Sequence, residues 1–181
     1  MSELPASKEI ALAKVTLSDI KMLQKISRET FLETFSAENT GENMTKYLNE
    51  AFSEQKLSDE LINKESQFYF AVLNGDVIGY LKLNVGQSQT ELRDGKALEI
   101  ERIYVLKEFH GKSIGQLLYT KALQAARQIN ADYVWLGVWE ENLRAINFYK
   151  KNGFVAFDKH VFKLGNDEQT DIMMKLLLKD T

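Results

Sequence analysis

Glu99 and Glu101 are the first residues whose type and spacing suit chemistry. They lie two positions apart in the stretch 98–105, so a strand there places both carboxylates on one face of a sheet. Two neighbouring carboxylates raise the pKa of one member, which suits a general base that works near neutral pH. The alternative is that one or both only form ion pairs, for which the chain offers Arg102, Lys82 and Lys96.

A candidate anion site follows the same stretch. In the segment 104–118 a strand ends, a short loop turns, and a helix with apolar periodicity begins. Unpaired backbone N–H groups and the positive end of the helix dipole attract anions at a helix N-terminus. Gly111 and Gly115 allow a pyrophosphate to approach the backbone closely, and His110 and Lys112 add donors or charge. Ordinary turn chemistry explains the same glycines, so this stretch alone does not establish a phosphate site.

The segment 142–154 has the pattern of a short capped helix followed by a strand. Asn142 fits the N-cap position, Tyr149 lies within the helix, and Gly153 fits a left-handed helix end. A tyrosine in this position is either a packing residue or a proton donor, and the pattern alone does not separate the two.

The elements that must position these residues follow from periodicity and turn signals. Strands are expected at 9–16, 67–72, 77–83, 98–105, 133–139, 154–162 and 169–178. Helices are expected from about 18 to 35, over 42–64, along an apolar face through Ile114 and Ala125, and over 143–151. Hairpins, such as the one around Asn74-Gly75-Asp76, alternate with crossover helices. This order predicts an α/β (α+β) fold with a mixed sheet and helices on both faces.

The two glycine-containing segments together resemble the GNAT acetyltransferase superfamily. Asn142 to Phe154 matches Asn-x-x-Ala-x-x-Phe-Tyr-x-x-x-Gly-Phe at every marked position, 32 residues after His110. The family's Arg/Gln-x-x-Gly-x-Gly/Ala motif falls on His110, Ser113 and Gly115, and the first two depart from it. These departures put cofactor affinity in question but leave the backbone amides in place. The resemblance covers roughly 9–178 and implies the GNAT fold, with a mostly antiparallel central sheet.

Other stretches resemble a narrower group, the PaiA-type subfamily, whose members are described as spermidine/spermine N-acetyltransferases. They are Ser66-Gln67-Phe68-Tyr69-Phe70, Leu98 to Tyr104, Trp135 to Glu140, and Asp167-Glu168-Gln169-Thr170-Asp171.

The resemblance implies acetyl-CoA as the co-substrate and assigns a role to each motif. The pantetheine arm lies beside Ile103, Tyr104 and Val105, where the Val105 N–H polarises the thioester carbonyl. Tyr149 protonates the departing sulfur. Asn142 makes a further contact with the cofactor. The pyrophosphate is held by the backbone amides of His110, Gly111, Lys112, Ser113, Ile114, Gly115 and Gln116.

The acceptor amine arrives protonated, because a lysine-like amine has a pKa near 10.4, and must lose a proton before it attacks. Either Glu99 or Glu101 assists, through water, and the other binds or orients the substrate. The chain has no cysteine, so the acetyl group passes directly to the amine in a ternary complex.

Phe31, Glu33, Trp139 and Glu140 offer aromatic and acidic groups near the expected acceptor mouth. This mixture suits a polyamine through ion pairs and cation–π contacts, although core aromatics with solvated charges give the same pattern. Rival acceptors are a protein N-terminus or lysine and another small amine such as an aminoglycoside. A non-catalytic CoA-binding regulator is the alternative outside the enzyme class.

Bulk properties set the remaining expectations. A length of 181 residues fits a single domain over 1–181. A net charge of −3 argues against a nucleic-acid partner, and no apolar run predicts a membrane span. The polar start lacks signal-peptide features, which predicts a cytoplasmic location. Two histidines 50 residues apart and no cysteine predict no metal site, and a homodimer stays open.

Overall fold

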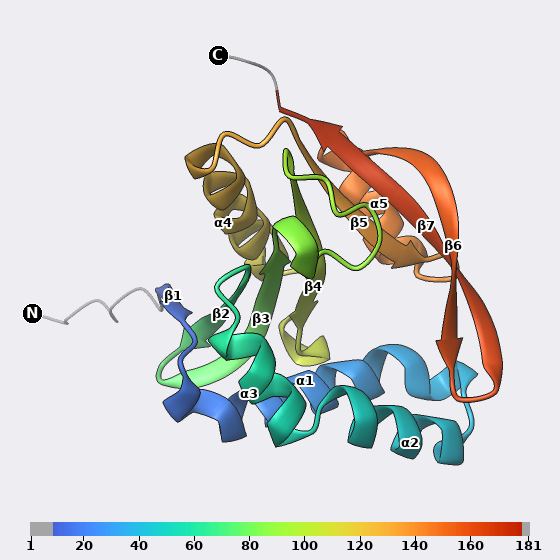
Figure 1. The fold of residues 1–181 in the computed structure, drawn as a ribbon. Coiled ribbons are helices and arrows are strands. Elements are labelled where there is room, and N and C mark those ends of the chain that lie inside the picture. The colour runs from blue at the N-terminus through green and yellow to red at the C-terminus, as the bar shows by residue number, and fades with distance from the viewer. Residues whose placement is uncertain (1–8, 179–181) are drawn as a thin grey trace, which may run out of the picture.

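The computed structural model describes residues 9–178; the polar start used to predict the location lies outside this part, in residues 1–8. Its centre is a seven-stranded sheet with the order β1-β2-β3-β4-β5-β7-β6 (Figure 1). The strands are β1 (Ile10–Lys14), β2 (Ser66–Leu73), β3 (Asp76–Asn84), β4 (Ala97–Val105), β5 (Tyr133–Trp139), β6 (Val155–Leu164) and β7 (Asp167–Leu177). All neighbouring strands are antiparallel except β4 and β5, which confirms the predicted mixed, mostly antiparallel sheet.

Helices cover both faces of the sheet, as predicted (Figure 1). On one face lie α1 (Ile20–Phe35), α2 (Gly41–Ala51) and α3 (Glu54–Ile62). They bury Leu23, Met44 and Leu57 against the strands. On the other face lie α4 (Ile114–Gln128) and α5 (Leu143–Lys151), which bury Leu118 and Ile146 in a second cluster.

The prediction of one helical stretch over 42–64 was wrong, because two helices meet there. Phe52 ends α2 in the core, with only 1% of its surface exposed. The Ser53 side chain then accepts a hydrogen bond from the backbone N–H of Lys56 at 3.2 Å and caps α3. Capping by a serine after a buried aromatic residue starts the new helix in a new direction.

The single parallel contact in the sheet is short. The pairing of β4 with β5 ends at Glu99 and Trp135, the last of three matched residue pairs. Beyond that point the two strands run on without pairing. This leaves a gap between the C-terminal halves of β4 and β5, and the gap positions the site described next.

A β-bulge in β4 sets which side chains face α1 and α3. Lys82 of β3 lies opposite Arg102 and Leu83 lies opposite Ile100, so Glu101 is the extra residue. A bulge turns two successive side chains to the same face. Glu101 and Arg102 therefore both point to the face that carries Glu60 of α3, where both join one ion-pair network.

Candidate active site

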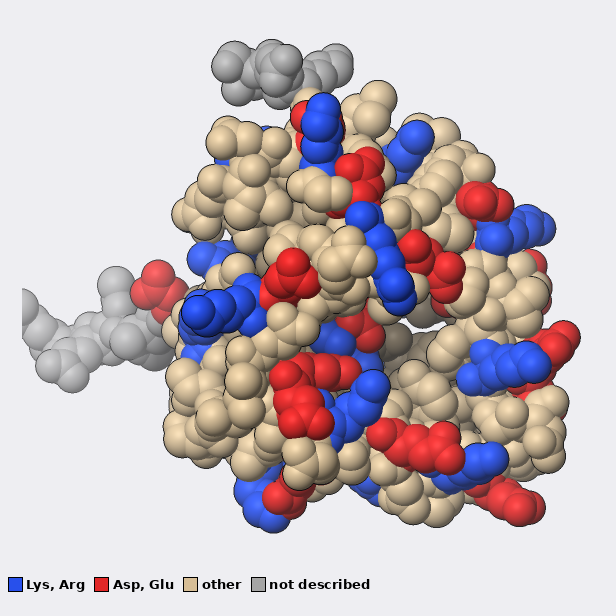
Figure 2. Space-filling view, in the orientation of Figure 1, with Lys and Arg blue, Asp and Glu red and all other residues tan. Residues whose placement is uncertain are grey.

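A cavity of about 210 Å³ passes through the gap between β4 and β5. On the side of α1 and α2 it is lined by aromatic side chains, among them Phe35, Tyr47 and Trp139. On the side of α4 and α5 it is lined by Ala145 and Tyr149. Figure 2 shows a hollow above α1 and α2 with acidic and basic side chains around its rim. The cavity therefore connects the two faces of the sheet, so that two molecules can meet inside it.

The free edge of β4 presents backbone amides to this gap. The N–H of Leu106 donates to the carbonyl of Ile78 on β3, at 2.9 Å. Backbone groups alternate in direction along a strand, so the amides of Ile103 and Val105 point away from β3 and into the gap. The N–H of Val105, the predicted polarising donor, therefore faces the gap.

His110 ties the following loop back to the end of β4. Its Nε2 lies 2.7 Å from the carbonyl oxygen of Val105, and its Nδ1 faces a guanidinium nitrogen of Arg144 on α5. A carbonyl can only accept and a guanidinium can only donate, so Nε2 carries the proton and Nδ1 is bare. Burial lowers the pKa of His110, and the Arg144 charge lowers it further, which keeps the ring neutral. The neutral ring links the two walls of the gap.

The segment after His110 has the backbone of an anion cradle. Gly111 and Ser113 adopt left-handed conformations, with φ of 76° and 61°, and α4 begins directly after them. A side chain at Gly115 would meet nothing within 4 Å, so the first turn of α4 is open on that side. These features fit the diphosphate of acetyl-CoA, with free amides and the positive end of a helix dipole.

Three other predicted cofactor-loop residues have side chains engaged within the protein. Ile114 is buried in the core, and Lys112 lies over the ring of Phe109 at 5.0 Å. The Gln116 side chain donates to Asn152 at 3.1 Å. These three residues therefore offer a phosphate their backbone amides rather than their side chains.

Tyr149 and Asn142 line the cavity on the side of α5. Asn142 accepts a hydrogen bond from the backbone N–H of Ala145 at 3.2 Å, which confirms it as the N-cap of α5. Tyr149 is 5% exposed, and burial raises its pKa, so its hydroxyl keeps its proton at neutral pH. Within the described residues no hydrogen bond engages that hydroxyl, which leaves it available to a molecule in the cavity.

Glu99 and Glu101 lie on one face as predicted and share one partner. The side-chain nitrogen of Asn84 donates to Glu99 at 3.0 Å and to Glu101 at 2.6 Å. Thr90 donates to Glu99 through its hydroxyl at 2.5 Å and through its backbone N–H at 2.9 Å. Glu99 is 2% exposed, and burial raises its pKa.

Glu101 has the opposite electrostatic environment. Burial acts to raise its pKa, but the charges of Arg102 and Lys82 outweigh burial and lower that pKa to about 2. Lys82 is 2.5 Å from the Glu101 carboxylate and also pairs with Glu60 of α3 at 3.1 Å. Glu101 is thus a fixed negative charge at the cavity wall and holds a proton weakly.

Of the four residues predicted to bind the substrate, the structure places two in the cavity and two outside it. Phe31 and Trp139 line the cavity. Glu33 does not line it and instead accepts a hydrogen bond from the backbone N–H of Lys107, at 2.9 Å. Glu140 lies outside the lining as well, with its backbone N–H bonded to Thr170.

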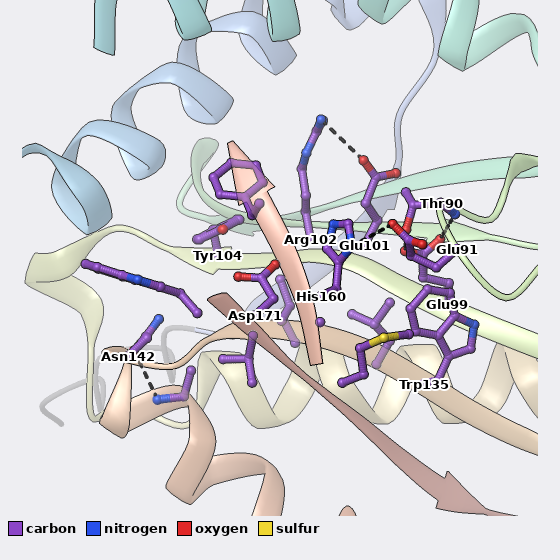
Figure 3. A pocket seen from close by; sticks show the side chains of 18 of the residues that line it. Thr90, Glu91, Glu99, Glu101, Arg102, Tyr104, Trp135, Asn142, His160 and Asp171 are labelled. Atoms are coloured by element: carbon purple, nitrogen blue, oxygen red, sulfur yellow. Dashed lines mark hydrogen bonds and ion pairs between the residues drawn. The ribbon is translucent and has the colours of Figure 1, made fainter. Parts of the chain in front are cut away.

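Acidic and aromatic groups that the sequence did not single out take these places. Asp171 of β7 lines the cavity, and burial raises its pKa to about 6 although the neighbouring His160 acts to lower it. Glu91 lies 3.0 Å from His160 at the rim, and Tyr47 stacks on Phe31 with 4.5 Å between ring centroids. Figure 3 shows Asp171 and His160 side by side at this end of the cavity. In the sequence, Asp171 stands in the stretch that resembles the PaiA-type subfamily, without an assigned role; its pairing with Trp139 on the neighbouring strand brings it to the cavity.

Within residues 9–178 no group of three His, Asp or Glu side chains is arranged to hold a metal ion. No helix of this part of the chain is long and apolar enough to cross a membrane.

Comparisons with known proteins agree with this geometry. The model of the acetyltransferase (GNAT) family matches residues 21–154. A protein described as an uncharacterized N-acetyltransferase, from Lactobacillus delbrueckii subsp. lactis, is 42% identical over 169 residues, which cover 93% of this chain and 98% of that protein. A spermidine N(1)-acetyltransferase of Thermoplasma acidophilum is 26% identical over 153 residues, covering 82% of this chain and 90% of the relative.

Among solved structures, the PaiA N-acetyltransferase of Thermoplasma acidophilum in complex with coenzyme A has the same fold. Its TM-score is 0.78 at 23% identity, and the match covers 94% of this chain and 99% of that one. The chain therefore belongs to the GNAT acetyltransferase family.

Its activity class follows from the family, the relatives and the site together. The protein is an acetyl-CoA-dependent N-acetyltransferase. The amides of β4, the left-handed turn before α4 and the free hydroxyl of Tyr149 all fit the co-substrate.

Proposed function

We propose that the protein is a PaiA-type enzyme that acetylates a primary amine of a polyamine, such as spermidine, by direct attack in a ternary complex. The observation that carries this proposal is the composition of the cavity on the side of α1 and α2. Among the described residues, four carboxylates line it, those of Glu91, Glu99, Glu101 and Asp171, and Arg102 is the one permanent cation in the lining. The relative from Thermoplasma acidophilum described as a spermidine acetyltransferase supports the same class of acceptor.

Charge and aromatic surface act together on such an acceptor. A polyamine carries ammonium groups separated by short apolar chains. The carboxylates at the cavity wall attract the ammonium groups, and the rings of Phe35, Tyr47 and Trp139 pack on the chains and form cation–π contacts. Glu101, held ionised by Lys82 and Arg102, provides a fixed negative charge that orients the acceptor.

On the side of α4 and α5 the protein holds the donor. Amides from His110 to Gln116 bind the diphosphate, while Ile103 and Val105 present their N–H groups to the arm that lies along the gap. Acetyl-CoA bound there supplies an acetyl thioester. The Val105 N–H stabilises the negative charge that develops on the thioester oxygen, and Tyr149 gives its proton to the departing sulfur.

The test is an assay of acetyl-CoA consumption against a panel of amines. Spermidine and spermine are compared with a monoamine of similar apolar length, an aminoglycoside, and a peptide with a free N-terminus and a lysine. We expect kcat/KM for spermidine to exceed that for the monoamine by about tenfold or more, since each additional ion pair at a partly buried site contributes on the order of 1 kcal/mol.

The other outcomes identify the alternatives. Turnover of the peptide above that of the polyamines assigns a protein acceptor, and an aminoglycoside preferred over both assigns a drug-like amine. Binding of CoA without turnover of any amine indicates a CoA-binding regulator.

A further inference from the structure

We propose that Asp171 is the catalytic residue that accepts the proton lost by the acceptor ammonium before the nitrogen attacks. This inference rests on the proposed acetyltransfer to a primary amine. It replaces Glu99 and Glu101, the glutamates to which the sequence assigned this role, with a residue that comes from a different strand.

The hydrogen bonds in the cavity single out Asp171. Both oxygens of Glu99 already accept from Thr90 and Asn84, and Glu101 is engaged by Lys82, Arg102 and Asn84. Glu91 is paired with His160 at the rim. Among the described residues that line the cavity, Asp171 is the one carboxylate whose oxygens form no hydrogen bond or ion pair, so its lone pairs are free to receive a proton.

The neighbouring strand leaves a path from Asp171 to the gap. Asp171 lies in register with Trp139, and its side chain leans toward Gly137 two residues earlier on β5. A Cβ at Gly137 would lie 3.4 Å from an Asp171 carboxylate oxygen. β5 borders the gap here, because its pairing with β4 ends at Trp135. The missing side chain at Gly137 therefore leaves open space between the Asp171 carboxylate and the place where acceptor and thioester meet.

The groups that face Asp171 support a carboxylate that exchanges a proton near neutral pH. The Asp171 side chain is half-buried, and burial raises the pKa of its carboxyl group to about 6. From β6, His160 lies directly opposite in register and lowers that pKa when it is charged. The other ionisable side chains that line the same cavity are Tyr47 of α2, Glu91 of the loop before β4, Glu99, Glu101, Arg102 and Tyr104 of β4, and Tyr149 of α5.

The proton balance of the reaction is complete with these residues. The ammonium gives one proton to the Asp171 carboxylate, which becomes a carboxylic acid and later releases that proton to solvent. The freed nitrogen lone pair forms the new C–N bond as the C–S bond breaks. The sulfur takes the bonding electron pair and the proton of the Tyr149 hydroxyl. The nitrogen loses its second proton, which restores Tyr149 through solvent, so one proton is released per turnover.

The test is the pH dependence of kcat/KM for spermidine in wild type and in Asp171→Asn. In wild type we expect activity to fall below about pH 6 as Asp171 becomes protonated. In the variant we expect an activity about 100-fold lower at pH 7, within the range of general-base effects, without that limb. The residual rate of the variant should rise about tenfold per pH unit toward the pKa of the amine, because only amine already deprotonated in solution reacts.

Glu168→Gln on the same strand is the matched control, because Glu168 is exposed and, within the described part of the chain, its side chain pairs with Lys163 alone. It should keep the wild-type profile, and CoA titration should show that both variants bind CoA as wild type does. An Asp171→Asn profile that superimposes on that of wild type would overturn the proposal. Loss of the acidic limb in Glu99→Gln, with the limb kept in Asp171→Asn, would overturn it as well. Wild-type protein that turns over no amine would instead reject the proposed function, so the two failures are distinguishable.

Discussion

The imidazole of His110 joins the Val105 carbonyl at the end of β4, with 2.7 Å between Nε2 and the oxygen. This contact lies where the cofactor loop begins, in place of the arginine or glutamine that the family motif carries. The imidazole is neutral in this arrangement, because its Nδ1 accepts a hydrogen bond from the guanidinium of Arg144 on the other side of the gap. The sequence departs from the motif here, yet the side chain has a defined structural partner.

His110→Ala is therefore expected to weaken CoA binding by about three- to tenfold, the effect of one hydrogen bond of about 1 kcal/mol. Isothermal titration with CoA measures it. His110→Gln restores an amide donor to the Val105 carbonyl and should recover most of the affinity. Equal affinity in all three proteins would show that the loop holds its conformation without this contact.

Tyr149→Phe is expected to lower kcat about 100-fold, since general-acid catalysis contributes factors of this order, and to leave the dissociation constant of CoA within about twofold of wild type. The removed hydroxyl has no hydrogen-bond partner among the described residues, so stability should change little. Tyr119→Phe is the matched control, a buried tyrosine of α4 that does not line the cavity. Turnover equal in the two variants would remove Tyr149 from the mechanism.

Most of the architecture could be predicted from the sequence because the signals are local. Asn74 and Gly75 adopt positive φ in the turn between β2 and β3, and Gly153 ends α5 with φ of 92°, as their residue types indicated. The break between α2 and α3 was missed, although Ser53 was its local signal. A serine after an apolar residue occurs often within helices as well, so the cap was not distinguishable from an exposed position.

The composition of the site was harder to predict because it depends on long-range register. Periodicity correctly placed Glu99 and Glu101 on one face, but the bulge at Glu101 that brings Arg102 beside it has no sequence signal. Asp171 reaches the cavity only because β7 inserts between β5 and β6 in the sheet order. An exposed-looking aspartate near a hairpin turn gives no indication of this placement.

Glu101→Gln is expected to destabilise the protein in a pH-dependent way. The pKa of Glu101 is about 2 in the folded protein against 4.5 unperturbed, so its charge stabilises the fold by about 3 kcal/mol at neutral pH. Because the folded pKa is the lower one, this stability is present above about pH 4.5 and is lost as the pH falls through 2. Urea unfolding at pH 7 and pH 3 should show a large wild-type advantage at pH 7 and a smaller one at pH 3.

Glu99→Gln is the matched control for that experiment. Burial raises the pKa of Glu99, so its ionisation costs stability as the pH rises, and removing the charge should not reproduce the loss seen at Glu101. Losses of equal size at both positions and both pH values would mean that packing, rather than charge, determines the effect.

Gly137 should be a position where a larger side chain lowers activity without harming the fold. Its backbone is in a conformation open to any residue, it faces the cavity, and a β-branched residue is favoured in a strand. Gly137→Ala adds a Cβ in ordinary contact with Asp171, and Gly137→Val adds two methyl groups in the space between that carboxylate and the gap. We expect the melting temperature to stay equal or rise in both variants.

We also expect kcat/KM for the amine to fall a few-fold in the alanine variant and at least about tenfold in the valine variant, because a bulky group excludes the acceptor from its reacting position. CoA affinity should stay unchanged, since the β4 amides and the α4 loop lie on the other wall. Gly41→Ala, at the exposed start of α2 with nothing within 4 Å of the added carbon, controls for a generic glycine effect. A Gly137→Val enzyme with wild-type turnover would mean that the acceptor reaches the thioester by another route and never passes Asp171.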